Sequence, residues 1–292
     1  MIVRASAKIN LSLDVVGRRD DGYHLVSMVM QSLYLHDVVT IEPQTREDGI
    51  FVSSNLPYIP NDDGNLAYRA ARILKEKYDI DDGIKIHLQK RIPVSAGLAG
   101  GSTDAAAVLF GVNKLYGLGL KMRDLMTIGE TIGADVPFCL MRGTALAENI
   151  GERLTRLAPM PECAILLAKP TFGISTKQAY KEVDEETNLV HPDVKGQVEA
   201  LEQGDLAGVI SRMGNVLEAP AIRQYDQISD LKKAMMENGA LGSLMSGSGP
   251  TVYGVFKDRE EAEDAKRRMI PYFGSVRFIV TAPFCPFKNE KR

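Results

Sequence analysis

The chain has 292 residues, of which 45% are hydrophobic and 25% charged, and its formal net charge is -3. These values are typical of a globular protein, and the length suggests two packed domains, with one large domain as the alternative. The slightly acidic balance argues against a nucleic-acid-binding or polybasic membrane surface. Any binding of phosphate must therefore depend on a local site.

The N-terminus and the cysteines favour a reducing compartment. Residues 1–8 lack the continuous apolar core of a signal peptide, and no apolar run approaches the roughly 20 residues that span a bilayer. Cys139, Cys163 and Cys285 are widely spaced and form no CxxC pair, which fits ordinary reduced thiols, buried or half-buried. We expect a cytoplasmic protein with no nucleic-acid or membrane partner, either a monomer or a homodimer.

The first predicted element is a strand over residues 3–15, where apolar and polar residues alternate. Lys8 and Asn10 then project from the same polar face, about 7 Å apart. Strands are also predicted at 38–42 and 84–89. Between them, a helix over 66–77 follows the turn-forming residues 60–64.

A glycine- and alanine-rich loop starts at Pro93 and runs into a helix predicted over 103–116. With so little side-chain bulk, backbone N–H groups can surround an anion, and the helix N-terminus adds partial positive charge. Ser102 and Thr103 are expected to cap the helix and to offer hydroxyl groups to a phosphate or its metal ion. The loop therefore predicts a phosphate site.

Better-known glycine loops do not match. Walker A loops require a lysine after the last glycine, and Gly101 is followed by Ser102. Gly97, Gly100 and Gly101 do not have the GxGxxG spacing of dinucleotide-binding folds. The protein-kinase loop lies between strands, whereas this one begins a helix. The alternative is a tight strand-to-helix turn without a ligand.

The rest of the chain continues as mixed α and β structure. Two prolines at 159 and 161 indicate a boundary, which predicts domains over 1–158 and 159–292 and an α+β order in both. The remaining predicted elements are a helix over 122–132 with Gly133 as its C-cap, strands at 144–148 and 164–168, helical stretches up to about 238, a glycine-rich segment at 242–249, a strand at 251–256, a helix at 259–269 and a strand at 276–281.

Three segments, at residues 5–11, 93–106 and 244–251, together resemble the GHMP small-molecule kinases, in the order in which that family carries them. The resemblance implies a two-domain α+β fold: an N-terminal domain like domain 2 of a ribosomal protein, a ferredoxin-like C-terminal domain, and an active site between them. It also implies that the third segment packs beside the phosphate loop. The implied activity is transfer of a phosphoryl group from ATP to an alcohol.

The resemblance assigns catalytic roles to Asp135 and Lys8. It places Asp135 beside the acceptor hydroxyl as the base, with Lys8 near it to keep the carboxylate ionised and to stabilise the moving phosphoryl group. Asn10 would hold the acceptor end of the substrate. The alternatives are that Asp135 only caps a helix ahead of Pro137 and that Lys8 is a solvated surface lysine.

The resemblance also implies binding residues. Residues 17–24 and 133–138 are similar to family members whose small-molecule substrate carries a cytidine diphosphate group. Tyr23 and His24 would read the cytosine, with Thr176 and Tyr180 near the same base. Asn65 and Leu66 would line the adenine pocket of ATP. The triphosphate would lie on Pro93, Val94, Ser95, Ala96, Gly97, Leu98, Ala99, Gly100, Gly101, Ser102 and Thr103.

Magnesium should bridge the β- and γ-phosphates, with Ser102 the nearest hydroxyl ligand and no convincing acidic cage in the sequence. Two other functions stay open. One is a GHMP kinase for another alcohol or phosphate, such as homoserine or mevalonate. Neither of these acceptors carries a nucleobase that Tyr23 and His24 could contact. The other is a non-catalytic binding module.

Overall fold

The computed structural model describes residues 1–45, 48–186 and 188–285. Contacts between residues divide the chain into two compact units that alternate along the sequence. Two long strands, β1 (Ile2–Arg18) and β2 (His24–Gln44), contribute to both. Unit 1 contains Met1–Ala7, Leu35–Val94 and Ala99–Met141, and unit 2 contains Lys8–Tyr34, Ser95–Leu98 and the described residues from Arg142 onward.

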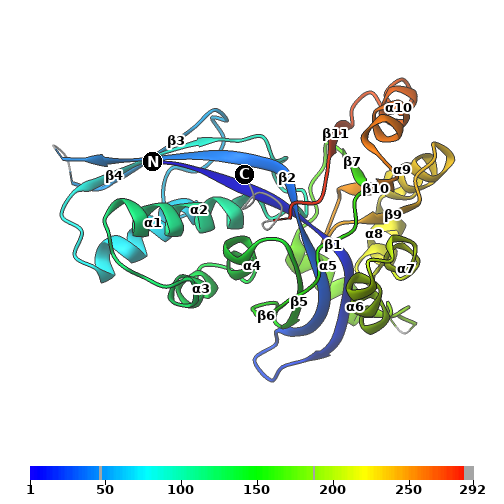
Figure 1. Ribbon diagram of the computed structural model, residues 1–292, viewed down its shortest axis with the longest axis horizontal. Helices are drawn as coiled ribbons and strands as arrows, with labels where there is room; N and C mark the ends of the chain where they lie inside the picture. The colour runs from blue at the N-terminus through cyan, green and yellow to red at the C-terminus, as the bar shows by residue number, and fades with distance from the viewer. Residues whose placement is uncertain (46–47, 187, 286–292) are drawn as a thin grey trace. The chain divides into compact units, whose positions relative to one another are not determined.

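Unit 1 is a sheet covered by helices. Strand β4 (Gly83–Gln89) pairs antiparallel with β2, from Val38 opposite Gln89 to Gln44 opposite Gly83, and parallel with β3 (Ile50–Ser54). Helices α1 (Leu66–Lys77) and α2 (Gly100–Leu115) lie side by side (Figure 1), and α3 (Met122–Glu130) and α4 (Val136–Met141) pack near α2.

The core of unit 1 forms where α2 approaches the sheet. Ile84, Ile86 and Leu88 alternate along β4 and are fully buried, which is the period of a strand with one face in the core. A β-carbon at Gly111 of α2 would lie only 2.3 Å from Ile41 Cδ1. Any larger residue at this position would therefore have to displace the end of the buried Ile41 side chain.

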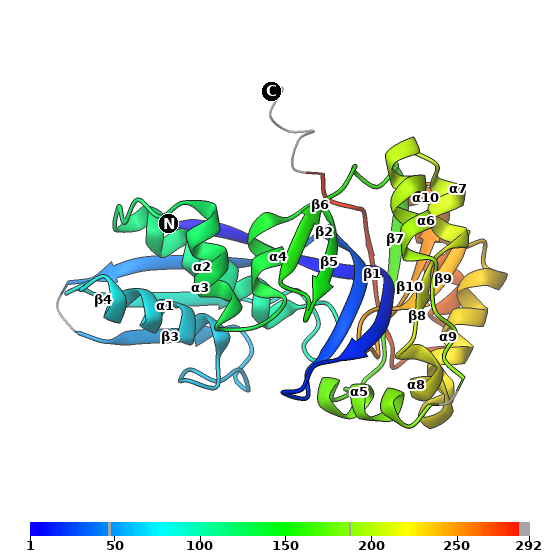
Figure 2. The ribbon, with the colours of Figure 1, turned by 90° about the horizontal axis from the view of Figure 1, so that it is seen from below.

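Unit 2 contains two strand assemblies. In the first, β5 (Thr144–Asn149) pairs antiparallel with β2 over Val26–Gln31 and with β6 (Arg153–Arg156), as Figure 2 shows. β8 (Gly214–Asn215) pairs parallel with β1 at Ser12 and Leu13.

The second assembly of unit 2 is a four-stranded antiparallel sheet in the order β11-β7-β10-β9. Helix α9 (Asp226–Glu237) packs on β9 and β10, and α10 (Arg259–Met269) packs on β7 and β11. The chain order strand, helix, two strands, helix, strand is that of a ferredoxin-like unit. Its strands are β7 (Ala164–Lys169), β9 (Gly242–Met245), β10 (Val252–Phe256) and β11 (Arg277–Thr281). Four further helices precede α9 in the chain: α5 (Thr176–Asp184), α6 (Val194–Gln203), α7 (Leu206–Ser211) and α8 (Glu218–Gln224).

Two predictions about helix ends are wrong. Helix α2 begins at Gly100, so Ser102 and Thr103 lie inside its first turn, and the N-cap is Ala99, which makes no side-chain cap. A left-handed turn at Ala99, with φ of 56°, starts the helix earlier than the hydroxyl residues indicate. Helix α3 ends at Glu130 with Thr131, not Gly133, as its C-cap.

The prediction for the cysteines is confirmed. Cys139 is buried, Cys163 and Cys285 are half-buried, and all three are free thiols. Burial raises the pKa of Cys163 to about 12, so this thiol is unreactive at neutral pH. Among the residues that the structure describes, no helix is both long and apolar enough to cross a membrane.

Candidate active site

The loop from Pro93 to Gly100 turns sharply before it enters α2. Ser95, Gly97 and Ala99 have φ values of 50°, 72° and 56°. Thr103 N donates to Ala99 O, the first backbone hydrogen bond of α2. The N–H groups that begin a helix have no acceptor within it, and the helix dipole is positive at this end. The loop therefore offers the donors that an anion needs.

The third motif packs against this loop inside unit 2, as expected. Ser246 Oγ donates to Gly97 O at 3.0 Å, and Gly249 N donates to Ser246 O at 2.9 Å. A β-carbon at Gly97 would lie 2.1 Å from Ser246 O, so only glycine fits. The two glycine-rich segments, about 150 residues apart in the chain, thus pack so closely that a side chain at Gly97 would clash with the third motif.

Lys8 and Asn10 of β1 lie at the same place in unit 2. Lys8 is only 5% exposed, and its Nζ donates to Asn10 Oδ1 at 2.7 Å. Lys8 N donates to Leu98 O at 3.2 Å, and a β-carbon at Gly247 would lie 3.2 Å from Lys8 Nζ. All three motifs therefore meet, and Lys8 is not a solvated surface lysine. An ammonium group is a strong hydrogen-bond donor to phosphate oxygens, so this position is consistent with the expected role of Lys8.

Two residues that the sequence analysis did not identify hold this cluster. Asn215 of β8 donates through Nδ2 to Met245 O at 2.9 Å and Gly247 O at 2.8 Å. Tyr253 donates its hydroxyl to Asn10 O at 2.9 Å. Neither residue belongs to a recognisable motif, and their roles become visible only in the folded chain.

In unit 1, Asp135 directly precedes α4 and is half-buried. Cys139 N donates to Asp135 O at 3.0 Å, so the backbone of Asp135 starts the helix. A β-carbon at Gly133 would lie 4.0 Å from Ser102 Oγ, which places the segment leading to Asp135 against the first turn of α2. The structure thus brings together the candidate base's segment and the candidate metal ligand.

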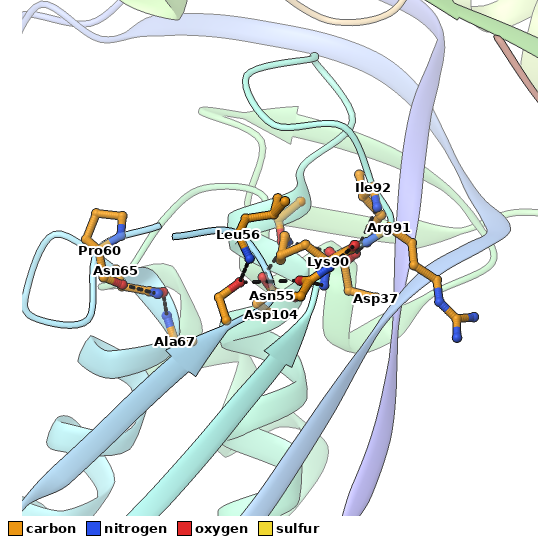
Figure 3. Close-up of polar contacts among 12 residues, drawn as sticks. Asp37, Asn55, Leu56, Pro60, Asn65, Ala67, Lys90, Arg91, Ile92 and Asp104 are labelled. Carbon is orange, nitrogen blue, oxygen red and sulfur yellow. Dashed lines mark hydrogen bonds and ion pairs between the residues drawn. The ribbon is translucent and has the colours of Figure 1, made fainter. Parts of the chain in front are cut away.

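Asn65 and Leu66, the expected adenine contacts, lie at the N-terminus of α1 in unit 1. Asn65 Oδ1 accepts from Ala67 N at 2.9 Å and its Nδ2 donates to Pro60 O at 2.7 Å, so this side chain caps the helix (Figure 3). A β-carbon at Gly101 would lie 3.6 Å from Leu66 Cδ1. Leu66 is therefore beside the first turn of α2.

The expected cytosine-reading residues cluster in unit 2. The rings of His24 and Tyr180 stack, with centroids 4.9 Å apart and an interplanar angle of 29°. Tyr23 is 61% exposed. Thr176 Oγ1 lies 3.0 Å from Ser248 Oγ, which links this end of α5 to the third motif. Aromatic rings and hydrogen-bonding groups at one place are suited to a nucleobase.

Asp184 is a member of this cluster that the sequence analysis missed. Its Oδ1 lies 2.7 Å from His24 Nε2, and its Oδ2 accepts from Arg18 at 3.2 Å. The available signal was its spacing, since Asp184 follows Tyr180 by one helical turn and shares its face of α5.

Next to the phosphate loop, unit 1 also contains a buried group of charges. Lys90 Nζ contacts Asp37 Oδ2 and donates to Asp104 Oδ2 at 2.5 Å, and their side chains converge in Figure 3. Burial opposes the charge on Lys90, but the two carboxylates hold its pKa above the ordinary value. Burial raises the pKa of Asp104 to about 7.

Replacing Asp104 by Asn should reduce the pH dependence of stability. The pKa of Asp104 rises from about 4 in the unfolded chain to about 7 on folding. Between these values the folded state binds more protons, so the contribution of Asp104 to stability falls as pH rises through that window. Thermal unfolding at several pH values should show a smaller decrease in Tm for Asp104→Asn than for the native protein. An unchanged decrease would contradict this assignment.

Comparison with known proteins places these features in a family. Residues 65–143 match the family model described as GHMP kinases N terminal domain, and residues 197–275 match GHMP kinases C terminal. The chain belongs to the GHMP kinase family. The two-domain α+β GHMP kinase fold that the motifs predicted is thereby confirmed.

The chain is also similar to individual members of the GHMP kinase family. It is 50% identical, over 96% of both chains, to a protein of Lachnospira eligens named 4-diphosphocytidyl-2-C-methyl-D-erythritol kinase. It is 44% identical, over 100% of both chains, to a protein of the same name from Caldicellulosiruptor saccharolyticus. A crystal structure of 4-(cytidine 5'-diphospho)-2C-methyl-D-erythritol kinase superposes with a TM-score of 0.82 at 34% identity, over 98% of this chain and 100% of that one.

More distant GHMP kinases share the fold. The structure of homoserine kinase from Cytophaga hutchinsonii superposes with a TM-score of 0.72 at 20% identity, over 96% of this chain and 95% of that one. Since the fold is common to kinases of different acceptors, the acceptor must be argued from the residues of the site.

Proposed function

We propose that this chain is an ATP-dependent kinase that phosphorylates the 2-hydroxyl group of 4-diphosphocytidyl-2-C-methyl-D-erythritol, a step of non-mevalonate isoprenoid synthesis in the cytoplasm. The main support is the meeting of Lys8, Asn10, Gly97 and Gly247 at one place in unit 2. Relatives at 44% and 50% identity over nearly the whole chain carry the name of this activity.

Phosphoryl transfer requires a base and positive charge. The oxygen of the 2-hydroxyl attacks the γ-phosphorus, the bond from that phosphorus to the β,γ-bridging oxygen breaks, and ADP leaves. Asp135 accepts the hydroxyl proton. Lys8 stabilises charge on the transferred group, and Asn10, held by Lys8 at 2.7 Å, orients the acceptor end.

The phosphates of ATP bind to the backbone of residues 93–103, with Leu66 and Asn65 towards the adenine. In the described part of the chain, no three His, Cys, Asp or Glu side chains are grouped to hold a metal ion. Mg²⁺ commonly binds through substrate phosphates and few protein ligands. Ser102 would supply a hydroxyl ligand to the ion, which when bound would neutralise charge on the phosphates.

The cytosine base binds to Tyr23, His24, Thr176 and Tyr180. The exposed ring of Tyr23 is available to stack on a base, and His24 and Thr176 offer hydrogen-bonding groups. Homoserine and mevalonate have no base for this cluster to bind. The cluster therefore favours the cytidine-containing acceptor over those of the other family members.

The proposal is tested by measuring ADP release from ATP and Mg²⁺ with three acceptors: the cytidine compound, homoserine and mevalonate. We expect turnover with the cytidine compound alone. Turnover with either of the others would overturn the acceptor and leave the kinase chemistry. No turnover with any of them, together with a salt-dependent shift of an RNA probe, would favour the binding module.

Replacing Asp184 by Asn should weaken binding of the cytidine acceptor. Asn keeps the shape but removes the charge that holds the His24 ring at 2.7 Å, so the KM for this acceptor should rise about tenfold. The kcat and the KM for ATP should stay within twofold. Glu182→Gln on the same helix is the matched control, since Glu182 contacts Gln178 and Gln224 instead of His24. Equal KM values for Asp184→Asn and Glu182→Gln would exclude this role.

A further inference from the structure

The buried group of Asp37, Lys90 and Asp104 joins the two ends of the phosphate loop. On the entering side, Asp37 Oδ1 accepts from Ile92 N at 2.8 Å and also from Arg91 N. Asn55 Oδ1 accepts from Lys90 N at 2.7 Å, and Asn55 Nδ2 donates to Lys90 O at 3.2 Å. The backbone that leads from β4 into the loop is therefore fixed before Pro93 (Figure 3).

The side chain of Lys90 reaches the leaving side of the loop. Its Nζ donates to Gly100 O at 3.2 Å and to Asp104 Oδ2 at 2.5 Å, both in the first residues of α2. Lys90, Asp37 and Asp104 side chains are 4%, 0% and 3% exposed. A single buried ammonium group therefore ties the start of α2 to the strand end from which the loop departs.

Burial of these three charged side chains reduces the stability of the folded protein, so a purely structural role does not explain them well. Two carboxylates share one lysine, and within the described residues Asp104 Oδ1 is buried without a hydrogen-bond partner. Burying such a group costs stability unless every atom is paired, and apolar side chains of the same volume are often at least as stable. Stability alone does not account for this choice of residues, whereas fixing the loop's two ends does.

We propose that Lys90, through Asp37 and Asp104, is a positioning residue that sets the spacing of the phosphate loop so that its N–H groups converge on the phosphates of ATP. This rests on the proposed function, since it assumes that ATP is the ligand of the loop. Lys90 acts on the nucleotide through the backbone of residues 91–100. Its loss should therefore weaken binding of the phosphates and leave binding of the nucleoside unchanged.

The test compares the affinities for ATP and for adenosine by titration calorimetry. In Lys90→Met, the ATP affinity should fall about tenfold, as hydrogen bonds to a charged ligand lose their alignment, while the adenosine affinity stays within twofold. The double variant Lys90→Met/Asp104→Asn removes one charge of each sign. It should fold even if Lys90→Met does not, because it avoids leaving both buried carboxylates without the lysine. It should show the same selective loss.

Lys75→Met is the matched control. Lys75 is also in unit 1, and its Nζ donates to Asp82 O and contacts Asp48, each at 2.9 Å, away from the phosphate loop. It should lower Tm without changing the ratio of ATP to adenosine affinity. An unchanged ratio in both Lys90 variants would overturn the positioning role. If the native protein binds no ATP, the proposed function itself fails.

Discussion

Replacing Asp135 by Asn should lower kcat by roughly 1,000-fold, the contribution typical of a positioned general base. The carboxylate accepts the proton of the attacking hydroxyl, and an amide cannot. The affinity for ATP should remain within twofold because the phosphates bind to the backbone of the loop. Single-turnover kinetics and titration with ATP measure the two quantities separately.

This substitution also separates the two interpretations of Asp135. The residue directly precedes α4, and Asn caps helices as well as Asp does. If Asp135 only capped the helix, Asp135→Asn would retain the native kcat. Asp124→Asn is the control: Asp124 accepts from Lys121 N at the start of α3 in the same unit, and its loss should reduce stability without slowing turnover.

Replacing Gly97 by Ala should lower turnover about 100-fold, since displacement of reacting groups by about 1 Å can cost that much. The new β-carbon would lie 2.1 Å from Ser246 O, so either the phosphate loop or the third motif must move. Both changes disturb the place where Lys8 and Asn10 lie. Tm should fall as well, because the clash is with the backbone oxygen of Ser246, which can move less easily than the end of a side chain.

Gly204→Ala is the control for backbone strain. Gly204 has a φ of 67°, close to the 72° of Gly97, but nothing lies within 4 Å of its β-carbon position. This variant should lose about 1 kcal/mol of stability from its positive φ and keep full activity. Equal activity of the Gly97 and Gly204 variants would show that contact between the two motifs is unimportant.

Elements with local signals were predictable to the residue. Helices over 66–77 and 259–269 match α1 and α10, because Asn65 and Asp258 cap them and glycine- or proline-rich turns lie outside them. By contrast, β2 runs from His24 to Gln44, and the alternation revealed only 38–42. Residues 28–33 are buried on both faces, so their strand has no period of two. β3, β6, β8 and β9 were also missed.

The site was predictable only where its residues lie in compact motifs. Lys8, Asn10 and the phosphate loop follow from such segments. Asn215 contacts Gly247, which lies 32 residues away in the sequence, and Asp184 contacts His24, which lies 160 residues away. Asp37 and Asp104 are 67 residues apart and meet only at Lys90. Asn215, Asp37 and Asp104 carry no signal in a single sequence, because the fold alone brings them to their partners, whereas Asp184 had only its helical spacing from Tyr180.

The chemical structure of the product tests the proposed kinase activity and its acceptor together. Incubation with ATP, Mg²⁺ and 4-diphosphocytidyl-2-C-methyl-D-erythritol, followed by phosphorus and carbon NMR, locates the new phosphate group. We expect one new phosphomonoester, coupled to the tertiary carbon that bears the 2-hydroxyl, with one ADP formed for each product molecule. ADP with unmodified acceptor, or a phosphate on another hydroxyl, would contradict it.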